Sequence, residues 1–214
     1  MIESIVDYWT ELDRSVHPRD RSTFDQFGDH GFNLEFPPPA YIGDIMNAPI
    51  IILENNGGFG ADRTPAEFPD KKAHEEFRAM LSAPRPLDLS QRTVSPYYRS
   101  RNYTRLLTSG LAAIVNGVPY RSINGRASRV AELTKVLPSA LFHQKWLRQA
   151  VFPLVESGKR FLIIHRWSRW NGATIIYLGH PNAVFSTAPV SKDLTSQEMI
   201  AAEKFLLRRG RAKP

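Results

Sequence analysis

Continuous apolar runs and amphipathic segments alternate along this chain of 214 residues. Ala48 to Leu53 is rich in β-branched residues, and Arg160 to Trp167 has a similar run, as expected of strands buried on both faces. The run from Ala173 to Gly179 predicts a further strand. Because helical patterns separate these strands, the sequence predicts an α/β fold with three layers, α/β/α, around a short, mainly parallel four-stranded central sheet.

Helical periodicity fills the segments between the strands. It favours helices from about Glu3 to Asp13, Pro69 to Leu81, Asn102 to Val115 and Pro138 to Glu156, and a final helix capped by Thr195 or Ser196. Three successive prolines require an extended backbone between Phe36 and Asp44. Since no linker or internal repeat interrupts the pattern, residues 1–214 are predicted to form a single domain.

The composition excludes several kinds of site. With no cysteine, the chain cannot form disulfides, thiolate zinc sites, cysteine nucleophiles or cysteine-held iron–sulfur clusters. No stretch approaches 18 apolar residues, and the acidic, amphipathic N-terminus differs from a secretory signal, so we expect no membrane association. The histidines lack metal-ligand spacing, so we expect neither a metal nor a cofactor. A cytoplasmic monomer is the resulting expectation.

The net charge of +7 is unevenly distributed. Residues 1–88 contain 16 acidic and 8 basic side chains, whereas residues 89–214 contain 5 acidic and 20 basic ones. The stretch from Leu89 to Ala131 has no acid, four tyrosines and seven arginines: Arg92, Arg99, Arg101, Arg105, Arg121, Arg126 and Arg129. Guanidinium groups suit phosphates and aromatic faces stack on unpaired bases, so we predict DNA as the partner. A solubilising basic face is the alternative.

Polar segments follow two of the predicted strands. Glu54-Asn55-Asn56-Gly57-Gly58 comes after the first, and His180-Pro181-Asn182 after the run ending at Gly179. Ligands of open parallel sheets bind beyond the carboxyl ends of the strands, so we expect both segments to face one crevice. Gly57 and Gly58 lack Cβ atoms, which allows a ligand close to the backbone. An ordinary turn and a structural histidine are the alternatives.

The two segments also resemble known motifs. Leu53 to Gly60 (LENNGGFG) resembles the first motif of the uracil-DNA glycosylase superfamily, in branches where it reads Gly-x-Asn-Pro-Gly. His180 to Val184 (HPNAV) resembles the second motif, His-Pro-Ser-Pro-Leu. The resemblance implies an enzyme that flips a base out of DNA and hydrolyses the bond between base and sugar without a metal.

The resemblance also implies roles for individual residues. Asn55 would hold the attacking water and His180 would donate a hydrogen bond to the departing base; Asn56 is the alternative water-holding residue and Glu54 an alternative general base. Phe59, Phe68, Gly57 and Gly58 would form the base pocket, with core packing as the alternative for the phenylalanines. The residues expected to contact DNA are Arg92, Arg99, Arg101, Arg105 and Asn182, with Val184 and Phe185 as a wedge in the vacated stack.

The substrate prediction follows from departures from these motifs. A middle strand ending in an Asn that reads uracil is expected between Pro86 and Tyr98, but this region contains no Asn. We therefore predict a monofunctional glycosylase with a larger pocket, for a modified pyrimidine such as a substituted or glycosylated cytosine. Such bases occur in some bacteriophage genomes, which suggests antiviral defence. The alternatives are repair of uracil or another deaminated or damaged base, a non-catalytic nucleic-acid-binding protein, and a hydrolase of nucleosides or nucleotides.

Overall fold

The computed structural model describes residues 3–124 and 128–211. Its central sheet contains β1 (Phe32–Asn33), β2 (Tyr41–Ile42), β3 (Ile50–Gly58), β4 (Ala112–Ser122), β5 (Phe161–Ile164) and β6 (Ala183–Phe185). The parallel strands lie in the order β4-β3-β5-β6, while the short β1 and β2 both pair antiparallel with β4. The predicted mainly parallel sheet is confirmed, and the two antiparallel additions raise its strands from the expected four to six.

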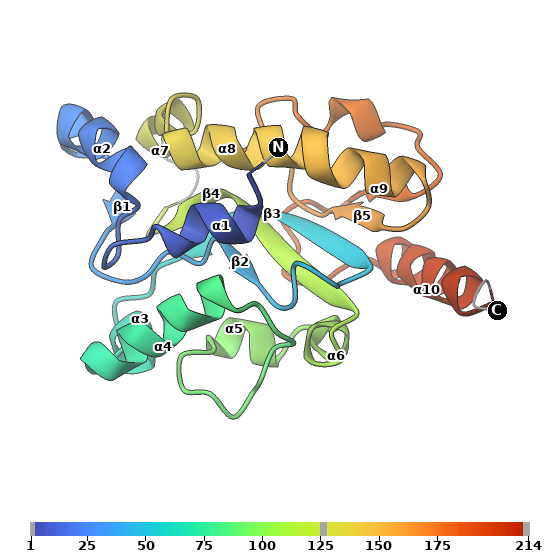
Figure 1. Ribbon diagram of the computed structural model, residues 1–214, viewed down its shortest axis with the longest axis horizontal. Coiled ribbons are helices and arrows are strands. Elements are labelled where there is room, and N and C mark those ends of the chain that lie inside the picture. Colours follow the sequence, from blue (N-terminus) through green and yellow to red (C-terminus); the bar gives the residue numbers. More distant parts are fainter. Residues whose placement is uncertain (1–2, 125–127, 212–214) are drawn as a thin grey trace.

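Helices cover both faces of the sheet (Figure 1). One face carries α3 (Thr64–Glu67), α4 (Lys71–Ser82), α5 (Pro96–Arg99) and α6 (Thr104–Thr108). The opposite face carries α7 (Ser128–Leu133), α8 (Pro138–Trp146) and α9 (Phe152–Glu156), the last two joined by a π-helical turn at Leu147–Val151. The remaining elements are α1 (Ile5–Thr10), α2 (Arg21–Phe27), α10 (Ser196–Arg211) and 3-10 turns at Pro18–Asp20 and Ile175–Tyr177. The three-layer prediction is confirmed.

The core forms around the parallel strands. Ile50 to Leu53 are fully inaccessible to solvent, and every residue of β4 is buried. Each such aliphatic side chain stabilises the fold by about 1.5–3 kcal/mol relative to an exposed one. Helix α1 joins the layers, since it contacts α4 and its Trp9 indole donates to His143 of α8 at 2.8 Å.

Several predicted helices are confirmed, with boundaries shifted by a few residues. Asp70 caps α4 by accepting from the backbone of Ala73 at 2.9 Å. Thr195 caps α10 in a reciprocal arrangement: its hydroxyl accepts from the Glu198 backbone, and its own N–H donates to the Glu198 carboxylate at 2.6 Å. Among the residues described, no helix is both long and apolar enough to cross a bilayer.

Three predictions of local structure were wrong. The first strand does not end at Leu53, because Glu54 to Gly58 continue to pair with β4 through a bulge at Asn56/Gly57. The helix expected from Asn102 to Val115 ends at Thr108, and the apolar run after it is β4. The strand expected from Ala173 to Gly179 is a 3-10 turn with two exposed isoleucines, so β6 begins only after the His-Pro-Asn segment.

A candidate active site at the switch point of the sheet

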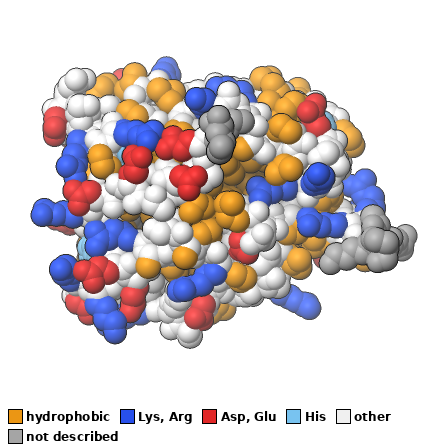
Figure 2. Space-filling model, viewed as in Figure 1, with side chains coloured by type: hydrophobic (Ala, Val, Ile, Leu, Met, Phe, Trp, Pro, Cys, Tyr) orange, Lys and Arg blue, Asp and Glu red, His pale blue; other side chains and the backbone are white. Residues whose placement is uncertain are grey.

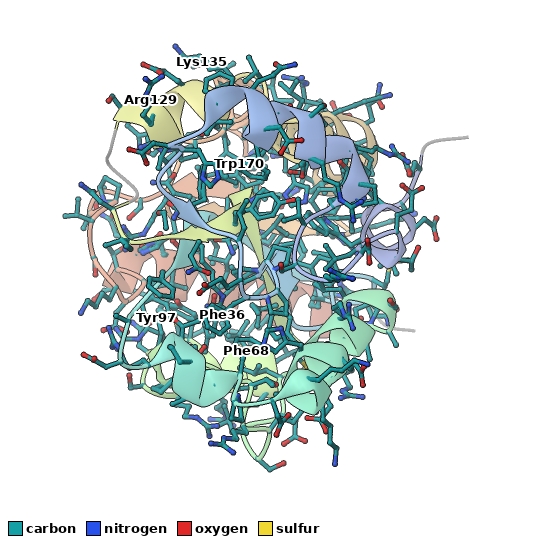
Figure 3. The ribbon with its side chains drawn as sticks, turned by 90° about the vertical axis from the view of Figure 1, so that its left-hand side faces the viewer. Phe36, Phe68, Tyr97, Arg129, Lys135 and Trp170 are labelled. Carbon is teal, nitrogen blue, oxygen red and sulfur yellow. The ribbon has the colours of Figure 1, made fainter. Side chains whose placement is uncertain are left out.

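A cavity of about 620 Å³ lies at the carboxyl ends of the central strands. From β3 the chain passes over one face of the sheet to β4, then over the other face to β5, on the opposite side of β3. Such a reversal leaves a crevice at the strand ends, where ligands of open α/β sheets bind. Figure 3 shows Trp170 above the sheet and Phe36, Phe68 and Tyr97 below it. The cavity walls are residues 54–60, 63–64, 67, 95, 97–98, 116, 121–124, 166–169 and 189–190, with Pro39.

Glu54 is the most unusual group in this cavity. The residue is 7% exposed; Oε2 accepts from the Arg166 guanidinium at 2.8 Å, whereas Oε1 has no hydrogen-bond partner. Burial raises the pKa of the Glu54 carboxyl, opposed by the positive charges of His165 and Arg166. Burial of a carboxylate oxygen without a donor is unfavourable, so Oε1 of Glu54 is placed to accept a hydrogen bond from a ligand or water.

Asn56 lies two residues further along β3 and also lines the cavity. Side chains two apart on a strand share a face, so Asn56 lies on the same side as Glu54. Its amide nitrogen donates to the Gly57 carbonyl at 2.9 Å and to the Ser122 hydroxyl at 2.7 Å. Both amide hydrogens are thereby engaged, which fixes the side chain and leaves its oxygen as an acceptor.

Asn55, the expected water-holding residue, has a different set of contacts. It alternates to the other side of β3, where its nitrogen donates to Ser168 at 2.9 Å and its oxygen accepts from the Arg169 backbone at 3.2 Å. Asn55 lines the cavity, but both ends of its amide hold the segment after β5. Of the two asparagines, Asn56 has the freer oxygen.

His180 does not lie with these residues, contrary to the expectation. His180 precedes β6, and Leu162 pairs in parallel with Ala183. His180 therefore lies near the amino ends of β5 and β6, whereas the cavity lies at the carboxyl ends of the strands. Its Nδ1 accepts from the Asn182 backbone at 3.1 Å. The error arises from the missed strand: the His-Pro-Asn segment leads into β6 instead of following a strand.

The expected wedge residues are also displaced. Val184 and Phe185 are inside β6, paired with Ile163 and Ile164 and packed partly on the core, and Asn182 donates to the Val155 carbonyl. None of these three lines the cavity. The loop after β6 instead brings Pro189 and Val190 to its wall, with Val190 67% exposed.

Three of the four residues expected to form the base pocket lie together. Gly57, Gly58 and Phe59 line the cavity. Phe68 does not; it is buried against Phe77, and the Arg121 guanidinium lies 5.2 Å from its ring centre. For Phe68, core packing is therefore the role that the structure shows.

The expected DNA-contacting arginines lie outside the cavity. Arg92, Arg99 and Arg105 are exposed. Arg99 donates to the Leu89 and Gln91 carbonyls, Arg92 donates to Ala66, and Arg101 pairs with Asp193 at 3.5 Å. Arg126 lies outside the described residues. On the face in Figure 2, basic and acidic side chains are mixed.

Sequence reasoning missed Asn116 as a site residue. It lies on β4 directly opposite Glu54, is 2% exposed and lines the cavity, and its amide nitrogen donates to the Pro39 carbonyl. Glu67 and Arg166 were missed as well. One signal in the sequence could have identified Asn116. It directly follows the apolar run from Ala112 to Val115, just as Glu54 directly follows the run from Ile50 to Leu53.

The described residues include no cluster of three or more His, Cys, Asp or Glu side chains arranged to hold a metal ion. No protein-family profile, curated protein or solved structure matches this chain.

Proposed function

We propose that this protein is a DNA glycosylase that hydrolyses the bond between a flipped-out base and its sugar. The observation that carries the proposal is Glu54, a buried carboxylate with one unpartnered oxygen in a deep cavity at the switch point. Asn56 on the same face supplies a fixed amide oxygen. A carboxylate and an amide oxygen suit the positioning and deprotonation of one water molecule.

The proposed reaction needs no covalent intermediate. Asn56 and Glu54 hold the water, whose oxygen bonds to the sugar C1′ as the bond from C1′ to the base nitrogen breaks. The base leaves with the electron pair of that bond, and Glu54 takes the proton from the water. Arg166 keeps Glu54 oriented through the 2.8 Å contact. Asn116, with its nitrogen held by Pro39, presents an amide that can contact the edge of the base.

The surface around the cavity supports DNA as the substrate. Trp167, Val190 and Ile123 line the cavity and are 52%, 67% and 78% exposed. Apolar side chains exposed beside a polar cavity can replace the stacking contacts that a flipped base loses. The net charge of +7 favours association with phosphates.

The proposed substrate is a modified pyrimidine, such as a hypermodified cytosine of phage DNA, which gives the enzyme a role in antiviral defence. The cavity volume of about 620 Å³ supports this choice, because it is ample for a pyrimidine that carries a substituent. Repair of uracil or another damaged base is the alternative that uses the same chemistry.

Incubation with duplexes that carry modified cytosines is expected to release free base and leave alkali-labile abasic sites without strand cleavage. No lysine is among the described residues that line the cavity, so a Schiff base with the sugar has no amine donor there. Mass spectrometry of released bases and gels with and without alkali measure both results. Trapping of a protein–DNA adduct by borohydride would contradict the monofunctional mechanism.

The same assay separates the other candidate functions. A nucleoside or nucleotide hydrolase would release base from free nucleosides or nucleotides, whereas the proposed enzyme requires DNA. A purely binding protein would retain DNA and release no base from any of the duplexes. Either result would overturn the proposal.

The acid limb of the pH–rate profile is expected to move to higher pH in Arg166→Gln. Burial raises the pKa of Glu54 and the Arg166 charge opposes this effect, so removing that charge raises the pKa further. Glu54 must be ionised to act as a base, and a higher pKa shifts the rise in rate upwards. Single-turnover rates between pH 4 and 9 give the midpoint.

Arg92→Gln is the matched control, since Arg92 is an exposed arginine that lies outside the cavity. Its acid limb should coincide with that of the wild type under saturating enzyme. An unchanged or lower midpoint in Arg166→Gln would contradict the assignment of Glu54 as the base.

A further inference from the structure

A second buried carboxylate lines the same cavity. Glu67, the last residue of α3, is 5% exposed, and its Oε2 has no hydrogen-bond partner. The Arg121 guanidinium lies 3.8 Å from that oxygen, beyond hydrogen-bond length. The reaction described above uses Glu54 and leaves Glu67 without a role. A second orphaned carboxylate oxygen indicates a second place where a ligand donates a hydrogen bond.

Arg121 gives this region its electrostatic character. It is 5% exposed, stands over the rings of Phe68 and Phe77, and donates to the Gly58 carbonyl at 3.4 Å. With Glu67 it forms a pair of opposite charges, and the charges of Arg63 and Arg99 also act on the Glu67 carboxyl. An anionic group would be repelled by the Glu67 carboxylate, and a cationic group by Arg121. A neutral group with both donors and acceptors satisfies the two together.

Arg121 and Glu54 lie at different positions along the paired strands β4 and β3. Arg121 pairs with Gly57, three residues beyond Glu54 on β3, and strands rise about 3.3 Å per residue. The Arg121 backbone therefore lies roughly 10 Å further along the sheet than that of Glu54. Tyr97 and Tyr98 line the same cavity and offer aromatic faces, which commonly pack on sugar rings. A base held at Glu54 would direct a substituent towards this pair.

We propose that Glu67 and Arg121 form a subsite for a neutral, polyhydroxylated substituent, such as a hexosyl group, on the flipped base. The assignment rests on the proposed glycosylase function and specifies what makes its substrate distinctive. One sugar hydroxyl donates to the free oxygen of Glu67, and neighbouring hydroxyls accept from Arg121. The aromatic face of Tyr97 or Tyr98 covers the sugar ring.

The test measures binding in a protein that cannot turn over. Glu54→Gln serves as the parent, and fluorescence anisotropy gives its Kd for duplexes with one central cytosine, hydroxymethylcytosine or glucosylated hydroxymethylcytosine. We expect the glucosylated duplex to bind at least about tenfold more tightly than the hydroxymethylated one, the range for a hydrogen bond to a charged group. Adding Glu67→Gln should reduce this preference to below about threefold.

Glu75→Gln is the matched control, because Glu75 lies on the exposed face of α4, outside the cavity; it should keep the full preference. Thermal unfolding shows whether each variant is folded. If Glu67→Gln does not fold, Glu67→Asp takes its place, because the shorter side chain withdraws the carboxylate by one methylene. Equal affinities in the parent, or a preference that survives both Glu67 variants, would overturn the subsite. Failure of wild type to release base from any duplex would instead overturn the glycosylase function.

Discussion

Glu54→Gln is expected to lower the single-turnover rate of base release by about 10²–10⁴-fold, the usual contribution of a positioned general base. Glutamine keeps the size of the side chain and a polar contact with Arg166, but it cannot take the proton from the attacking water. DNA binding should persist, because Glu54 is buried and contributes no positive charge. Rates under enzyme excess and Kd values for the same duplex measure the two effects separately.

His180→Ala distinguishes the site in the structure from the one expected from the sequence. His180 lies at the other edge of the sheet, so this variant should retain base release within about threefold of wild type, as surface substitutions usually do. A large loss in His180→Ala together with an active Glu54→Gln would show that the chemistry occurs elsewhere.

Gly57→Ala is expected to destabilise the protein by about 1–3 kcal/mol, the usual cost of inserting a methyl group into a packed region. An added Cβ would lie 2.3 Å from Cγ of Pro39, whose ring cannot rotate away. Pro39 would have to shift, and its carbonyl holds Asn116 in the cavity wall. The variant should therefore also lose base release.

Gly58→Ala is the matched control, since nothing lies within 4 Å of its added Cβ. Differential scanning fluorimetry should show Gly57→Ala melting several degrees below wild type, given about 2–4 °C per kcal/mol for a chain of this size, and Gly58→Ala unchanged. Equal melting temperatures for the two variants would contradict the close contact with Pro39.

The sequence predicts those parts of the fold in which local pattern and tertiary environment agree. Ile50 to Leu53 and Phe161 to Ile164 are apolar, rich in β-branched isoleucine and almost entirely buried, so their pattern alone predicts strands. The run from Ala112 to Val115 is as deeply buried, but its two alanines and the helix before it favour a continuous helix. Pairing with β3 overrides that local preference.

The site was less predictable because its residues depend on where strands end in space. Ile175 and Ile176 suggest a strand, yet they are exposed in a 3-10 turn. Because a strand was expected there, His180 was expected at the carboxyl ends of the strands, whereas it lies near their amino ends. Glu54 was identified only as an alternative, since the sequence does not show which residue after a strand becomes buried. The sequence favours Asn55 over Asn56 as the water-holding residue, whereas the hydrogen bonds in the structure engage both ends of the Asn55 amide and leave the Asn56 oxygen freer.

Segment 166–170 loses its conformational freedom when the chain folds. The Arg166 backbone donates to Leu53, the Asn55 side chain bonds both Ser168 and Arg169, and the Trp170 indole donates to the Glu54 carbonyl at 3.0 Å. Immobilising one side chain on binding costs about 0.5–1.5 kcal/mol of free energy. In this wall of the cavity, these hydrogen bonds already fix the side chains in the free protein, so binding does not add that cost. Association with a flipped base should therefore occur without a slow closing phase in this part of the cavity.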